Sequence, residues 1–186
     1  MAKNCVFTVK YKRKRQGRTN YKKRLALLKS DKTRLVIRKT NTSILLQIVK
    51  YNPDGDYVIS TFNSTKLNSY GWNYSKKSIP AAYLAGLSIG KMALAKKVDE
   101  VIVDLGLQTP CKGSKIFAAI QGAFDSGLKL NIDETIFINE ERLSGKHIAN
   151  MKDVDALFSK YKKDKLDVSK IPETFNAVKK KILGDN

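Results

Sequence analysis

The arrangement that most constrains the fold is a long helical pattern placed between strand-like segments. Residues 81–97 form this apolar helical pattern, with Pro80 in its first turn and Ser78 as a candidate cap, and residues 100–106 follow as a continuous apolar strand. Three β-rich runs joined by turn-forming residues precede the helix and predict an antiparallel meander. These runs are residues 34–40, 43–51 and 56–62. A helix between strands requires a crossover connection, so we expect an α/β fold whose mixed sheet adds a parallel strand to the meander.

Further helical patterns are expected to pack around this sheet. They cover residues 19–29, 113–127, 139–150, 153–163 and 173–183. In the first of them, Leu25, Leu27 and Leu28 would dock against the core, and Pro172 is expected to break the last two apart. Helix 81–97 carries small residues that would let it approach a neighbour closely, namely Ala82, Gly86, Gly90 and Ala93.

The chain is therefore expected to have three parts. They are a basic arm with the first helix at residues 1–30, an α/β core at residues 31–150 and a helical C-terminal extension at residues 151–186. The hydrophobic content of 42% is sufficient for a sizeable core. No apolar run approaches the length of a membrane span and no secretory signal is recognisable, so we expect a cytoplasmic protein without a membrane partner.

The basic arm is the strongest indication of function. The first thirty residues contain eleven Lys or Arg and no Asp or Glu, in a chain of net charge +19. Such a segment repels itself and lacks the apolar periodicity to fold alone, so it is expected to settle against a dense polyanion. Phosphate backbones supply that charge, and Tyr11 and Tyr21 can stack on unpaired bases. The alternative is a solvated basic tail that aids solubility or contacts membrane lipids.

Patterns for catalysis, metals and nucleotide cofactors are incomplete. Residues 86–90 match the nucleophile elbow G-x-S-x-G around Ser88, and downstream carboxylates and His147 follow in hydrolase order. An elbow requires a strand immediately before the serine, whereas that segment has a helical pattern, so a serine hydrolase is only a minor alternative. Cys5 and Cys111 form neither a disulfide framework nor a zinc knuckle. We expect no enzyme, no cofactor, no metal site and no small-molecule substrate.

Candidate RNA contacts therefore come from basic and aromatic residues. The arm is expected to contribute Lys10, Tyr11, Lys12, Arg13, Lys14, Arg15, Arg18, Tyr21, Lys22, Lys23 and Arg24. Beyond the arm, the expected contacts are Arg34, Arg38, Lys39, Trp72, Lys76, Lys77, Lys112, Gly113, Ser114 and Lys115. The loop 108–115 lies between a buried strand and a helix start, where backbone N–H groups form an anion site, although an ordinary capped helix explains it equally well. Trp72 is equally well explained as a plug at the edge of the core.

Several strings, in their order and spacing, resemble one family. The strings are KYKRKRQGRTNYKKRLALL, RLVIRKTNTSILLQIVKY, YGWNYSKKSIPAAYLAGLSIGK and DLGLQTPCKGSKIFAAIQGAFDSGL, and ERLSGKHIA extends them. They resemble large-subunit ribosomal protein eighteen of the universal set, in its archaeal and eukaryotic form, a family that binds 5S ribosomal RNA. The tail is similar to the extended C-terminal form of this family, which the shorter bacterial form lacks.

The resemblance implies a structural constituent of the large ribosomal subunit. Its arm and the adjoining surface would hold 5S RNA and dock it beside 23S ribosomal RNA in the central protuberance, with neighbouring ribosomal proteins as further partners. Residues 112–115 match the family's TKGSR-like loop, with two departures. Cys111 stands where a threonine or similar small residue is expected, and Lys115 replaces the usual arginine, which removes the bidentate fork. The remaining alternative is a general RNA-binding chaperone.

Overall fold

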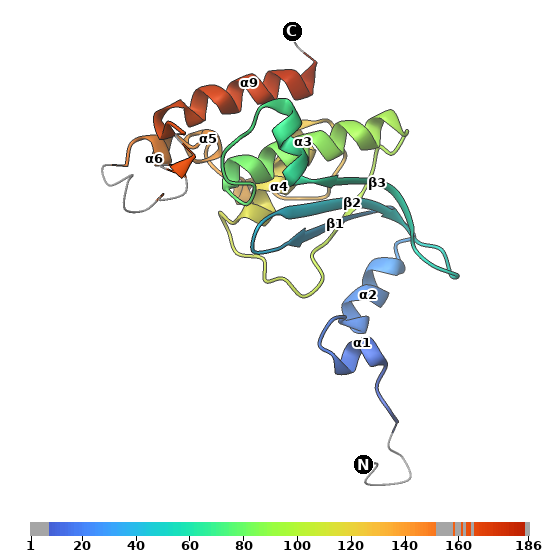
Figure 1. The fold of residues 1–186 in the computed structure, drawn as a ribbon. Coiled ribbons are helices and arrows are strands. Elements are labelled where there is room, and N and C mark those ends of the chain that lie inside the picture. The colour runs from blue at the N-terminus through green and yellow to red at the C-terminus, as the bar shows by residue number, and fades with distance from the viewer. Residues whose placement is uncertain (1–7, 152–157, 159–160, 162, 165, 185–186) are drawn as a thin grey trace.

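Four strands form one mixed sheet in the computed structural model, which describes residues 8–151, 158, 161, 163–164 and 166–184. The strands are β1 (Arg34–Lys39), β2 (Ile44–Lys50), β3 (Tyr57–Asn63) and β4 (Ile102–Asp104). Their order is β3-β2-β1-β4, with antiparallel pairs in the meander and β4 parallel to β1 (Figure 1). The predicted α/β fold with a mixed sheet is confirmed.

The fourth strand is shorter than expected. It has three residues instead of seven, because the chain pairs with a second segment before it reaches β1. Glu100 forms an isolated parallel bridge with Lys129, and the amide of Val101 donates to the carbonyl of Lys129 at 3.2 Å. At the other end, Gly106 takes a φ of +61° and turns the chain away from the sheet.

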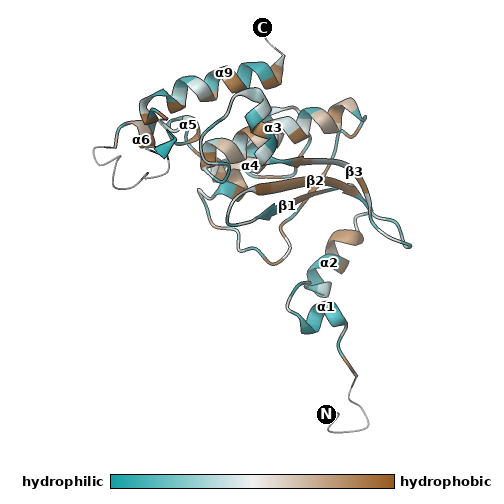
Figure 2. Cartoon of the chain, in the orientation of Figure 1, coloured by the Kyte–Doolittle hydropathy of each residue, from teal (hydrophilic) through white to brown (hydrophobic). Residues whose placement is uncertain are grey.

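The hydrophobic core lies between one face of the sheet and two helices. Alternate strand residues point into it, and the most deeply buried are Leu35, Ile37, Ile44, Leu46 and Ile48. The helices that cover this face are α3 (Ile79–Ala95) and α4 (Lys115–Asp125) (Figure 1). Figure 2 shows the strands of the meander largely in hydrophobic colours between the helices and the hydrophilic arm. The expected cap of α3 is present, since Ser78 Oγ accepts from the amide of Ala81 at 3.3 Å.

Helices α3 and α4 cross with their backbones in close contact. A Cβ added at Gly86 would collide with the carbonyl oxygen of Ala119, and one added at Gly122 would collide with that of Tyr83. The expected small-residue stripe therefore serves this crossing. A Cβ added at Gly90 would contact residues nearer the C-terminal end of α4 than a Cβ added at Gly86 would. The two helices therefore run in the same direction.

The segments at the two ends of the chain differ from the sequence pattern in detail. Helix α2 (Tyr21–Leu28) forms as expected, but its docking is weak, because Leu25 is 60% exposed and only Leu27 and Leu28 are half-buried. Pro172 does not break a helix; it lies in the first turn of α9 (Ile171–Leu183), where a missing N–H costs nothing.

The expected helix at residues 139–150 is split in two. Gly145, with a φ of +82°, separates α5 (Glu140–Ser144) from α6 (Lys146–Ala149). Most of the expected helix at 153–163 lies outside the described residues. The remaining elements are α1 (Lys12–Arg15) and the 3-10 helices η1 (Ser64–Tyr70), η2 (Glu134–Ile136) and η3 (Val168–Lys170).

Candidate nucleic-acid interface

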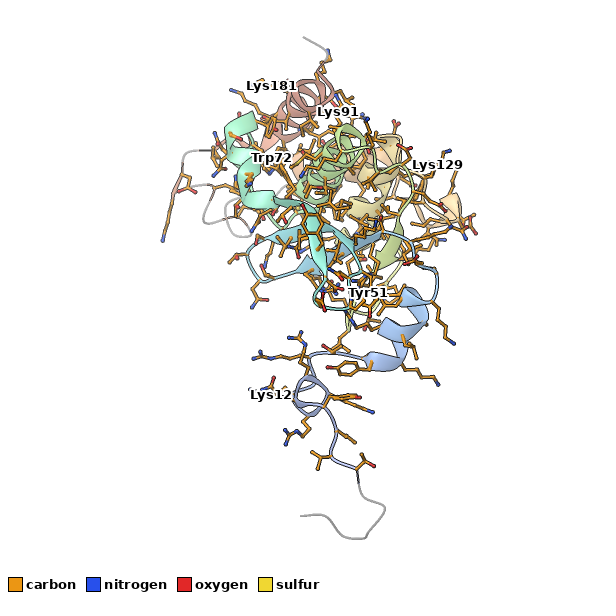
Figure 3. The ribbon with its side chains drawn as sticks, turned by 90° about the vertical axis from the view of Figure 1, so that its right-hand side faces the viewer. Lys12, Tyr51, Trp72, Lys91, Lys129 and Lys181 are labelled. Atoms are coloured by element: carbon orange, nitrogen blue, oxygen red, sulfur yellow. The ribbon has the colours of Figure 1, made fainter. Side chains whose placement is uncertain are left out.

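The arm projects from the sheet on the side opposite α3 and α4 (Figure 1). It contains two short helices, α1 and α2, joined by a turn in which Gly17, with a φ of +63°, reverses the chain. Asn20 caps α2 by accepting from the amide of Lys23 at 3.2 Å, and Arg13 donates to Thr19 at 2.9 Å. Within residues 8–30 of the arm, the exposed basic side chains are Lys10, Lys12, Arg13, Lys14, Arg15, Arg18, Lys22, Lys23 and Lys29. Figure 3 shows Lys12 well away from the body of the protein.

Two tyrosines lie together within this basic surface. The rings of Tyr11 and Tyr21 have centroids 5.0 Å apart, and their planes are tilted by 46°. Tyr21 is half-buried, whereas Tyr11 is 71% exposed. The pair fixes the start of α1 against α2 and leaves most of one ring free, which is the arrangement a stacking platform for a base requires.

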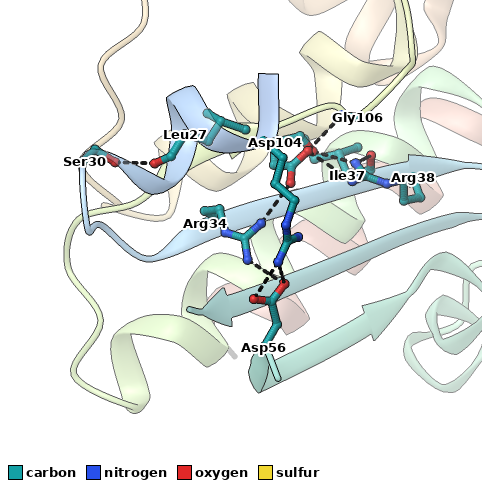
Figure 4. Close-up of polar contacts among 9 residues, drawn as sticks. Leu27, Ser30, Arg34, Ile37, Arg38, Asp56, Asp104 and Gly106 are labelled. Carbon is teal, nitrogen blue, oxygen red and sulfur yellow. Dashed lines mark hydrogen bonds and ion pairs between the residues drawn. The ribbon is translucent and has the colours of Figure 1, made fainter. Parts of the chain in front are cut away.

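A chain of alternating charges anchors the base of the arm to the sheet. Asp56 accepts from Arg24 at 3.0 and 2.9 Å and from Arg34 at 2.7 Å. Arg34 also reaches Asp104 at 3.3 Å, and Asp104 accepts from Arg38 at 3.1 Å (Figure 4). Asp104 further accepts from the amide of Gly106 at 2.8 Å, which fixes the turn after β4.

These ion pairs change the roles expected for two arginines. Arg34 is only 1% exposed, so the structure does not offer it as a surface RNA contact, and Arg38 is half-buried against Asp104. Burial alone would raise the pKa of Asp56, but hydrogen bonds from Arg34 and Arg24 outweigh it and lower that pKa. The sequence analysis missed both aspartates, because they lie 22 and 70 residues from Arg34 and no local pattern links them.

Trp72 belongs to the core and is not available as a stacking surface. It is 1% exposed, its Nε1 donates to the carbonyl of Ser75 at 3.2 Å, and its ring meets that of Tyr74 edge-on at 5.4 Å. Of the two explanations considered for this residue, the plug at the edge of the core fits. Lys76 donates to the carbonyl of Trp72, whereas Lys77 is exposed.

A second basic region forms where the two parallel strands end. Lys39 is the last residue of β1, Lys77 precedes α3 and Lys115 begins α4, so strand ends and helix starts meet at one edge of the sheet. Burial lowers the pKa of Lys115, and the positive charges of Lys77 and Lys39 lower it further. Ser114 Oγ is buried and has no hydrogen-bond partner. Lys112 and Gly113 lie in the same loop before α4, and binding of an anion there stays a prediction.

Among the described residues, no group of three or more His, Cys, Asp or Glu is arranged to hold a metal ion, and none of the helices could span a membrane. Ser88 lies within α3 and donates to the carbonyl of Leu84 at 2.9 Å, so it does not have the geometry of a nucleophile elbow.

Comparison with known proteins identifies the family. Residues 6–101 match the family described as ribosomal large subunit proteins 60S L5 and 50S L18. The chain is 41% identical over 191 residues to large ribosomal subunit protein uL18 of Thermofilum pendens, covering 98% of this chain and 97% of that protein. Proteins of the same name from Methanobrevibacter smithii and Methanosphaera stadtmanae are 38% and 39% identical, with the same coverage. The matches run almost from end to end, and the chain therefore belongs to the uL18 family of large ribosomal subunit proteins, a family of structural proteins, in its archaeal form.

Proposed function

We propose that this protein, as a structural constituent of the large ribosomal subunit, binds 5S ribosomal RNA and docks it beside 23S ribosomal RNA in the central protuberance. The observation that carries this proposal is the arm. Over residues 8–30 it presents nine exposed basic side chains and an exposed tyrosine, on two short helices and the segments beside them, with no acidic residue among them. A surface of this kind matches a folded RNA backbone better than it matches any neutral partner.

The two basic regions divide the work of RNA recognition. Lys and Arg of the arm bind phosphates and supply affinity that falls as the salt concentration rises. Tyr11 adds stacking on an unpaired base, which favours RNA loops over continuous duplex. The lysines at the end of the parallel strands lie at the opposite end of β1 from the residues that anchor the arm, so they contact a different part of the RNA. Two separated contacts would fix the orientation of 5S RNA on the protein.

Binding to 5S RNA at near-physiological salt, with transfer RNA as competitor, tests the proposal. The variant K12A/K14A removes two exposed charges of the arm, and K180A/K181A removes two exposed charges of α9 as a matched control. We expect the arm variant to bind 5S RNA at least roughly tenfold more weakly, because charged hydrogen bonds contribute about 1.5–3 kcal/mol each, and the control to bind like the unmodified protein.

Selectivity separates this function from that of a general chaperone. The unmodified protein should prefer 5S RNA to transfer RNA, and Tyr11→Ala should reduce that preference more than any single lysine change does. Equal affinity for both RNAs would show a general RNA-binding protein instead.

A further inference from the structure

A pocket of about 710 Å³ opens at the end of the sheet farthest from the arm. It lies between the β1–β2 turn, the loop after η1 and the residues Phe158, Tyr161 and Asp164, and its volume falls within the roughly 300–1,000 Å³ typical of ligand sites. The residues of interest in its lining are Asn41, Asn68, Asn73, Lys77, Phe158 and Tyr161. No residue of the described part of the arm, 8–30, contributes to it.

One side of the pocket is an aromatic wall held in a fixed position. The rings of Phe158 and Tyr161 are parallel within 5°, with centroids 5.4 Å apart, and Tyr74 meets Tyr161 edge-on at 5.6 Å. The amide of Ser75 donates to the Tyr161 hydroxyl at 2.9 Å, and the Tyr74 hydroxyl donates to the carbonyl of Asp167 at 2.6 Å. Hydrogen bonds to the backbone therefore set both tyrosines before any ligand arrives, so little entropy is lost when a flat ring binds there.

Three side-chain amides lie around the mouth of the pocket. Asn41, Asn68 and Asn73 are exposed, and in the part of the chain that the structure describes none of these side chains makes a hydrogen bond. An amide presents a donor and an acceptor side by side, which matches the edge of a nucleobase. Amide groups near an aromatic wall are the combination with which proteins read unpaired bases.

The charged residues of the lining are Lys76, Lys77 and one carboxylate, Asp164, and the lining joins the second basic region through Lys77. Lys77 belongs both to the lining and to the group of lysines, with Lys39, that act on Lys115. A ligand with a flat polar ring at one end and an anion at the other complements this distribution. An acidic peptide would satisfy the lysines but leave the aromatic wall and the amides unused.

We propose that this pocket binds one unpaired nucleotide of ribosomal RNA, with its base against Phe158 and the asparagine amides and its phosphate toward Lys77. The inference rests on the proposed function only in that the RNA is ribosomal, because the pocket and the arm share no residue. This contact would recognise a base, whereas the lysines and arginines of the arm would contact phosphates.

Heteronuclear NMR of the full-length protein at near-physiological salt tests the proposal. Trp72 is the only tryptophan, and its indole N–H donates to Ser75 in the loop that lines the pocket, so a single resolved signal reports on the site. We expect a single-stranded tetranucleotide of mixed sequence to shift this signal and the side-chain amides of Asn41 and Asn73 in a saturable way. A duplex of the same sequence should leave them in place, and a 5′-mononucleotide should shift them with lower affinity.

Two variants and a control locate the base. Phe158→Ala should weaken binding of the tetranucleotide at the pocket about tenfold, as expected for loss of one base–aromatic contact, and Asn73→Ala should weaken it without touching the aromatic wall. Tyr57→Ala removes an aromatic ring that is 66% exposed and outside the pocket, and should have no effect.

Several results would overturn the proposal. Equal shifts with duplex and single strand would mean that only phosphate binds, and shifts confined to arm signals would mean that the pocket is empty. An effect of Tyr57→Ala as large as that of Phe158→Ala would remove the evidence for a specific base contact. The two proposals can fail separately. If K12A/K14A loses 5S RNA binding but the tetranucleotide still shifts the pocket signals, only the arm contact is affected. If the protein binds 5S RNA but the tetranucleotide does not shift the pocket signals, the pocket proposal alone is wrong.

Discussion

At the scale of single residues, charge in the sequence does not reveal which arginines can reach RNA. Arg34 and Arg38 are four residues apart on the same face of β1, and both donate hydrogen bonds to Asp104. Lys39 follows them and is exposed, because it is the last residue of the strand. A buried guanidinium requires a carboxylate partner, so the aspartates decide which cations remain for a ligand.

Asp56→Asn should destabilise the fold and loosen the arm. It leaves the buried Arg34 with Asp104 as its one remaining carboxylate partner among the described residues and removes the partner of Arg24, so we expect a loss of about 1–3 kcal/mol in the free energy of unfolding at pH 7. Urea denaturation measures this loss. Asp54→Asn, in the same hairpin and exposed, is the matched control and should change stability by less than about 0.5 kcal/mol.

The pH dependence of this effect has a definite sign. The folded state lowers the pKa of Asp56, so its stabilisation is fully present above the ordinary pKa of 3.8 and is lost as the pH falls through the lower folded value. The difference between the unmodified protein and Asp56→Asn should therefore be constant from pH 7 to 5 and shrink below pH 4. A difference that stays constant down to pH 3 would show that the ion pairs are not its cause.

At the scale of elements, patterns that depend on neighbours in sequence could be predicted, and pairings between distant segments could not. The meander, the cap at Ser78 and the small-residue stripe of α3 all follow from local periodicity. The length of β4 depends on Lys129, which pairs with the segment before the strand, and no periodicity in residues 100–106 shows that. The pocket likewise combines the β1–β2 turn with Tyr161, more than a hundred residues away, so the sequence pattern pointed to Lys76 and Lys77 but not to the distant residues that line the pocket with them.

Gly86→Ala tests the close crossing of α3 and α4. Helix propensity alone would favour alanine by about 1 kcal/mol, but the new methyl group would collide with the backbone carbonyl of Ala119, which has no flexible side chain to move aside. Overpacking of this kind costs about 1–3 kcal/mol or more, so we expect a net loss of stability and a lower urea midpoint. Gly55→Ala, where the added methyl group meets nothing within 4 Å, is the control and should be neutral. A stabilised Gly86→Ala protein would mean that the helices are further apart than described.

At the scale of the whole molecule, the proposed contacts for RNA lie at two places separated by a region of compensated charge. The arm leaves from one end of the open sheet face (Figure 1). The second basic region lies at the C-terminal end of β1, and the pocket adjoins the β1–β2 turn. Between them, Asp56 and Asp104 offset the arginines of β1. The sequence shows that the N-terminal part is basic, but only the fold separates free cations from paired ones.

The salt dependence of 5S RNA binding can count the free cations. Each phosphate contact contributes roughly 0.7–0.9 to the slope of log affinity against log salt concentration, so K12A/K14A should reduce the magnitude of that slope by about 1.4–1.8. Arg38→Gln removes the same charge as a single lysine change, yet it should leave the slope nearly unchanged, because Arg38 is engaged by Asp104 and not by phosphate. If Arg38→Gln lowered the slope as much as one arm lysine does, the pairing would have to open when RNA binds. In that case the open face of the sheet, and not the arm alone, would hold the RNA backbone.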